Sequence, residues 1–103
     1  IKLDISHHGG TKGMIECDAA DSGSFEIAAS LVTELLNLGT AGFPTIVVTR
    51  EATRGTAVIA PGRVELSVAS AVERAVQIPG VVSCTETAQC TSGKTCQSDL
   101  TCK

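Results

Sequence analysis

The chain has 103 residues, a length that fits one domain, and its 43% hydrophobic content is sufficient for a modest core. A net charge of −3 with scattered basic residues argues against a phosphate-binding surface, so we expect no nucleic-acid partner. Two phenylalanines, with no tryptophan or tyrosine, also leave few rings to stack on bases. No apolar run approaches the roughly 18 residues of a membrane-spanning helix, which predicts no transmembrane segment.

The first third of the chain alternates apolar and polar residues over short stretches, which predicts short strands. They lie at residues 1–6, 14–17 and 24–27. Residues 18–24 (DAADSGS) predict a turn, because Asp and Ser side chains bond to their own backbone. A short helix is expected at 31–38, with Ser30 as its cap and Gly39 at its end.

The middle of the chain predicts further strands. Residues 45–49 (TIVVT) are β-branched and predict a buried strand, residues 50–55 (REATRG) a polar hairpin, and residues 56–60 a second strand. Pro61 and Gly62 then predict a turn. Residues 64–78 alternate as in a half-buried strand, yet valines four apart also fit a helical face. We favour the strand because β-branched side chains lose rotamer freedom in a helix.

The order of these elements, mostly strands with one short helix, predicts a small antiparallel β-sandwich. We expect a β domain at residues 1–82 and a cysteine-rich tail at residues 83–103. The chain begins with Ile rather than Met, so we expect a processed or incomplete product that lacks any signal peptide.

The tail carries four cysteines spaced six residues apart in a polar segment with little to bury, which predicts a disulfide-stapled structure. They are Cys84, Cys90, Cys96 and Cys102. Three pairings are possible, of which the interlocked one, 84–96 with 90–102, is compact. Disulfides place the protein in an oxidising space. Cys17 is left over, either as a buried thiol or as the partner of a cysteine in another segment or chain.

Three short motifs suggest chemistry. Residues 5–9 (ISHHG) look like the strand-end element of metallo-β-lactamase-fold hydrolases, where His7 and His8 would meet a metal. The chain has no third histidine, and adjacent histidines in a strand face opposite sides, so we expect an exposed strand end. Residues 21–24 (DSGS) resemble the nucleophile segment of chymotrypsin-like proteases, and Asp18 and Asp21 offer oxygens to Ca²⁺. There we expect a plain turn. Residues 91–94 (TSGK) form a loop that would inhibit a protease if Lys94 were inserted into its active site.

Longer segments carry a family resemblance. Residues 21–31 (DSGSFEIAASL), followed by 45–50 (TIVVTR), resemble a module of secreted bacterial surface proteins and lipoproteins. In that module a D-x-G-x-F-x-I-P-A turn and strand lead to a leucine helix and an x-V-x-R strand. Here Ala28 replaces the proline of the pattern. The tail is similar to the cysteine-rich segments that follow such modules. The resemblance covers residues 14–103 and implies an immunoglobulin-like sandwich.

These observations predict a secreted structural or adhesive module, or a subunit of an extracellular assembly, rather than an enzyme. We expect no cofactor and a location outside the cell, at its surface or in the periplasm. The partner is expected to be a protein, or a second copy joined through a sheet edge, because residues 1–13 are too few to complete a sandwich. A small metal-dependent hydrolase fragment using His7 and His8, or a protease inhibitor presented by the tail, is the alternative.

Overall fold

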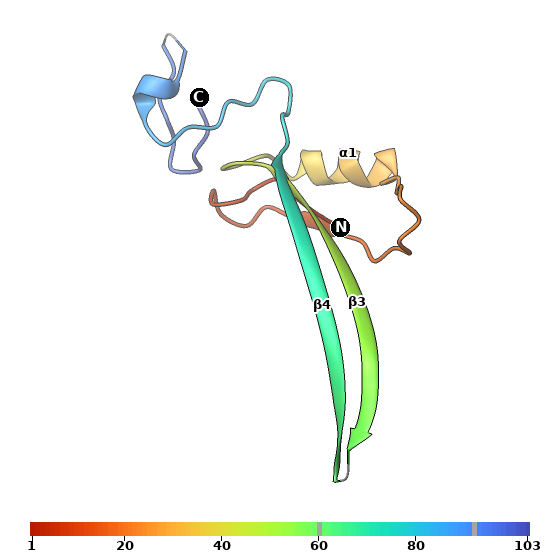
Figure 1. The fold of residues 1–103 in the computed structure, drawn as a ribbon. Helices are drawn as coiled ribbons and strands as arrows, with labels where there is room; N and C mark the ends of the chain where they lie inside the picture. Colours follow the sequence, from red (N-terminus) through yellow and green to blue (C-terminus); the bar gives the residue numbers. More distant parts are fainter. Residues whose placement is uncertain (60, 92) are drawn as a thin grey trace.

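A computed structural model gives the fold and describes residues 1–59, 61–91 and 93–103, with the side chains of 54–59 and 63 left aside. One antiparallel sheet of four strands has the order β2-β1-β3-β4, and one helix lies beside it (Figure 1). The elements are β1 (Lys2–Asp4), β2 (Met14–Glu16), α1 (Ala29–Asn37), β3 (Thr45–Ile59), β4 (Gly62–Ala75) and the 3-10 helix η1 (Thr87–Gln89). The prediction of a mostly β chain with one short helix is therefore confirmed. The described residues form a single sheet.

The longest elements differ from expectation in two respects. Residues 50–55, predicted as a polar hairpin, instead continue β3, because residues 50–54 pair in register with residues 66–70 of β4. A shift in register between Arg54 and Ala57 absorbs the extra residues, as a β-bulge does. The strand form of residues 64–75 and the turn before Gly62 are confirmed, but residues 76–78, predicted as the end of that strand, lie beyond β4 and are not strand. Ala60, the predicted last residue of a strand, lies outside the described residues.

Two further predictions in the first third of the chain are wrong. Residues 24–27 form no strand, because no neighbouring strand pairs with them. Helix α1 begins after Ala28, whose side chain cannot cap it, so Ser30 lies inside the first turn rather than before it. The helix ends as predicted, since Gly39 follows with a positive φ of 85°.

The core is small and lies where α1 crosses the base of the sheet. Leu3 pairs with Ile15 on β2 and with Ile46 on β3, so all three side chains share one face. Leu35 of α1 packs on that face with Ile5. Val32, Ile27, Val76 and Ile78 are half-buried around them. This face fixes which side of β3 and β4 is apolar.

A second contact joins the loop of residues 41–43 to the segment that follows β1. Residues 41–43 run beside residues 5–9, where Ala41 N–H donates to the Ile5 carbonyl and Phe43 N–H donates to the His7 carbonyl (3.1 and 2.8 Å). A Cβ atom at Gly9 would lie 2.1 Å from the Gly42 backbone nitrogen. Only glycines allow the two backbones to approach so closely.

We expect Leu35→Ala to lower the free energy of unfolding by about 2–4 kcal/mol, because the lost side chain leaves a cavity in a core with few other buried members. Urea unfolding followed by circular dichroism measures the change. Leu31→Ala is the matched control, since Leu31 lies on the same helix but is largely exposed. It should cost less than about 1 kcal/mol. Equal losses in the two variants would contradict this account of the core.

Candidate functional site

Beyond the core the sheet narrows to a long two-stranded ribbon of β3 and β4 (Figure 1). The edge of β3 that faces away from β4 pairs with β1, and only over Thr45–Val47. The rest of β3 pairs with β4 alone, and it makes ten of the thirteen residue pairs between the two strands. A two-stranded hairpin is at best marginally stable by itself in water.

One face of the ribbon is an apolar row of five large side chains that are between 46% and 59% exposed. These residues, called the apolar row below, are Val48, Val64, Leu66, Val68 and Val72. Val48 pairs with Val72, and Val68 pairs with Ala52. The row lies on the same face as Leu3 and Ile46, so it continues the core outward along the sheet. The pair of Arg50 with Ser70 lies on the same face and interrupts the row between Val72 and Val68. Monomeric proteins nevertheless rarely leave so many neighbouring large apolar side chains in water.

The opposite face of the ribbon is polar or small. Its pairs are Val47 with Glu73, Thr49 with Ala71, Glu51 with Ala69 and Thr53 with Ser67. The two faces thus differ as the inner and outer faces of a sheet do when one of them is covered.

Helix α1 is too short to cover the apolar row. Its 9 residues span about 13 Å at 1.5 Å per residue. The 14 residues of β4 span about 46 Å at 3.3 Å per residue. The helix therefore covers only the base of the sheet. An apolar groove of about 170 Å³ beside it, lined by Leu35, Leu36, Val76 and Ile78 among others, shows that even this cover is incomplete.

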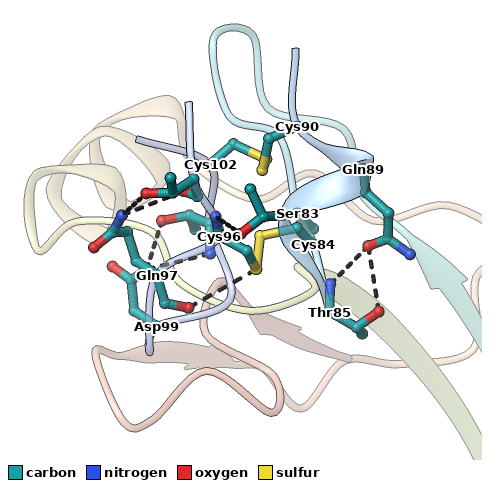
Figure 2. The surroundings of a disulfide bond; sticks show 12 residues. Ser83, Cys84, Thr85, Gln89, Cys90, Cys96, Gln97, Asp99 and Cys102 are labelled. Carbon is teal, nitrogen blue, oxygen red and sulfur yellow. Dashed lines mark hydrogen bonds between the residues drawn. A yellow bond between two sulfur atoms is a disulfide. The ribbon is translucent and has the colours of Figure 1, made fainter. Parts of the chain in front are cut away.

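The C-terminal knuckle, residues 83–103, is held by two interlocked disulfides, Cys84–Cys96 and Cys90–Cys102 (Figure 2). The compact pairing is thus the one present. The three sulfurs of Cys84, Cys90 and Cys102 lie within 4.8 Å of one another, the one such group of possible metal ligands in the described part of the chain. All three are oxidised to disulfides, so they offer no thiolate to an ion.

Hydrogen bonds attach this knuckle to Gly42, in the loop that lies beside residues 5–9. Gly42 N–H donates to the Asp99 carbonyl (2.7 Å), and Ser83 Oγ donates to the Gly42 carbonyl (2.5 Å). Within the knuckle, Thr85 N–H donates to Gln89 Oε1 (2.7 Å; Figure 2). The knuckle is therefore attached at the base of the sheet and leaves the ribbon uncovered (Figure 1).

Asp99 organises the last turn of the knuckle. Its carboxylate accepts hydrogen bonds from Lys103 Nζ, Thr101 Oγ1 and Thr101 N–H. The bond from Lys103, followed by the bond from the Thr101 side chain, lowers the pKa of Asp99 from 3.8 to about 2. The carboxylate therefore stays charged throughout the ordinary pH range.

The two histidines do come together. Both follow the end of β1 at Asp4, and His8 has a positive φ of 64°, which brings the ring centroids within 3.9 Å. The expectation that they face opposite sides is wrong, because strand alternation no longer applies in this turn. His7 Nε2 also lies 3.8 Å from Glu73 Oε1 of β4. The metal-dependent hydrolase remains a prediction.

The other singled-out residues lie apart from one another. Asp21 forms a two-pronged ion pair with Arg50 of β3, with both N···O distances 2.9 Å, and Ser22 Oγ donates to the Ser24 carbonyl (2.7 Å). Cys17 is a free, half-buried cysteine whose backbone pairs with Ile1. Lys94 is exposed in a turn next to Ser92, which lies outside the described residues.

The sequence does not identify the apolar row as an exposed surface. The alternation of residues 64–72 indicates only a half-buried strand. The row is left exposed because residues 50–54 pair with β4 and lengthen the ribbon beyond the reach of α1.

No family model, curated protein or solved structure matches this chain. In the ranges described, no helix has both the length and the apolar character needed to cross a bilayer. The resemblance to an immunoglobulin-like module therefore remains a prediction.

We expect the stability contributed by Asp99 to depend on pH. Because its pKa in the folded protein lies below the ordinary value, this contribution is present above about pH 4 and is lost as the pH falls from about 4 to about 2. Carboxyl chemical shifts followed by NMR measure the pKa. In Lys103→Met it should rise toward 3.8, because the largest cause of the shift is removed. An unchanged pKa in that variant would show that Lys103 does not hold the carboxylate.

Proposed function

We propose that this protein is a secreted structural or adhesive module that acts through protein–protein contacts of the β3–β4 ribbon. One observation carries the proposal: the apolar row continues the core face outward and leaves five large side chains in water. Surfaces of this kind are typical of sites that another protein covers.

The shape of the ribbon supports contact along its face and edges. A second β layer over the apolar row would give the two-layer arrangement of an immunoglobulin-like sandwich, with side chains of both layers meeting in a common core. In this proposal the partner supplies what α1 is too short to supply. No catalytic step is assigned to the module.

The knuckle supports a location outside the cell, at its surface or in the periplasm. Two disulfides close loops with a sequence separation of 12 residues in a segment that has few apolar side chains. Each loop stabilises the folded segment by roughly 3 kcal/mol in the chain-entropy description, and such bonds persist in oxidising compartments.

The test introduces charge into the apolar row and follows association in the cells that make the protein. We expect wild type to give a crosslinked species of higher mass. Leu66→Lys with Val68→Lys should abolish it, because burying two ammonium groups opposes contact. Both side chains are already largely exposed, so the variant should still fold. Chemical crosslinking followed by electrophoresis is the measurement.

The matched control adds the same two charges to the polar face of β3, as Thr49→Lys with Thr53→Lys. This variant should retain the crosslinked species. The proposal fails if wild type gives no such species, or if the variant of the apolar row associates as wild type does.

A further inference from the structure

We propose that the partner at the free edge of β4 is a second copy of this chain, paired antiparallel about a two-fold axis at Val68. The result is a continuous sheet with the strand order β3-β4-β4-β3. This inference rests on the proposed function, since it names the partner of the same ribbon.

The first argument is the exposed edge itself. β4 is the last strand of the sheet, so one row of its backbone N–H and C=O groups has no neighbouring strand within the described residues. Natural edge strands avoid pairing through prolines, lysines, bulges or short length. Gly62–Ala75 is 14 residues long, contains neither proline nor lysine, and carries its four charged residues near its two ends, so that its centre is uncharged. The bulge of the ribbon lies in β3, between Arg54 and Ala57, so β4 itself runs without an inserted residue.

The outer edge of β3 is protected by comparison. β1 pairs with its first residues, and the ion pair between Asp21 and Arg50 holds the loop of residues 18–24 at the next positions. The bulge then distorts the remainder. Strand addition is therefore favoured at β4.

The second argument is that β4 is complementary to itself in one register. With the axis at Val68, Val64 lies opposite Val72 of the second copy, and Leu66 lies opposite Ser70. Val68 lies opposite its own equivalent. Directly opposed β-branched and apolar residues stabilise antiparallel pairs. Residues 66–72 (LSVASAV) carry no charge, so the centre of the interface is free of like-charge contacts.

The side chains of β4 favour this register over its neighbours. Moving the axis to Ala69 places Glu65 opposite Glu73 of the second copy, and like charges across strands oppose pairing. With the axis at Val68, Glu65 lies opposite Ala71 instead. Moving the axis to Ser67 places Val64 opposite Ser70 and Val72 opposite Gly62, so fewer apolar side chains meet.

The symmetry closes the assembly. A two-fold axis perpendicular to the sheet uses the same edge of both copies, so pairing stops at a dimer instead of propagating into a filament. It also keeps the apolar rows of the two copies on one side, where they form a single wider face. The dimer therefore joins the two ribbons into one sheet and leaves both knuckles at its far ends.

The test measures the register directly with cysteines on the polar face, in a Cys17→Ser background. Ser67 of one copy lies opposite Ala69 of the other in the proposed register. Opposed Cα atoms are about 4.5–5.5 Å apart, which a disulfide can bridge. A mixture of the Ser67→Cys and Ala69→Cys chains should therefore form a disulfide-linked heterodimer on mild oxidation. Non-reducing mass spectrometry identifies the heterodimer by its mass and verifies that the knuckle disulfides are intact.

The single variants are the controls. In Ser67→Cys alone, or Ala69→Cys alone, the new cysteines are two residues out of register and beyond the roughly 7 Å that a disulfide allows. Neither should form a linked homodimer. Crosslinking of Ser67→Cys alone would place the axis at Ser67, and crosslinking of Ala69→Cys alone would place it at Ala69. Either result would overturn the proposed register.

Sedimentation of wild type separates this inference from the proposed function. A dimer that forms the 67–69 disulfide and that the Leu66→Lys, Val68→Lys variant dissociates supports both. A monomer that is nevertheless crosslinked to a different protein in cells overturns the self-pairing and retains the proposed function. A monomer with no crosslinked species overturns both. Face-to-face association of apolar rows gives a dimer without the 67–69 disulfide, and it also overturns the edge pairing.

Discussion

Burial of Leu3, Ile5 and Leu35 is the constraint on which the rest of this structure depends. Leu3 sits on the central part of the sheet, between Ile15 and Ile46, so covering it with Leu35 fixes the position of α1 and the apolar face of three strands. Ile46 lies on the same face as Leu3, and alternate residues of a strand face opposite sides. The face of Ile46 therefore determines the face of every later residue of β3, up to its bulge. Pairing with β3 then determines the faces of the residues of β4. The apolar row is thus a consequence of the core.

The ribbon and the helix that covers its base are mismatched in length, and this mismatch leaves exposed the surface on which both proposals rest. A helix gains 1.5 Å per residue and a strand about 3.3 Å, so a nine-residue helix cannot cover fourteen-residue strands. The uncovered part has one apolar face, one polar face and an unprotected edge at β4. Such a ribbon gains stability from association, which is the physical basis for both proposals.

The knuckle is stabilised by different means. It has few apolar side chains to bury and depends on two disulfides and on the hydrogen bonds around Asp99. Its attachment at Gly42 uses backbone groups, and the close approach of Gly9 to Gly42 requires that both lack a side chain. The protein therefore combines a domain with a small hydrophobic core and a knuckle closed by disulfides. The two are attached at Gly42, where its backbone packs against Gly9.

The sequence alone was enough to predict a mostly β chain, the helix ending before Gly39, the strand after Pro61 and the disulfide-stapled tail, because each depends on local propensity or on cysteine spacing. It could not decide among the three disulfide pairings, nor where β3 ends. Residues 50–55 are polar and read locally as a turn, yet pairing with residues 66–70 satisfies their backbone groups as a strand. The exposure of Val68 and its neighbours likewise depends on how far α1 reaches across the sheet. These features depend on contacts between residues distant in sequence, which only the tertiary structure decides.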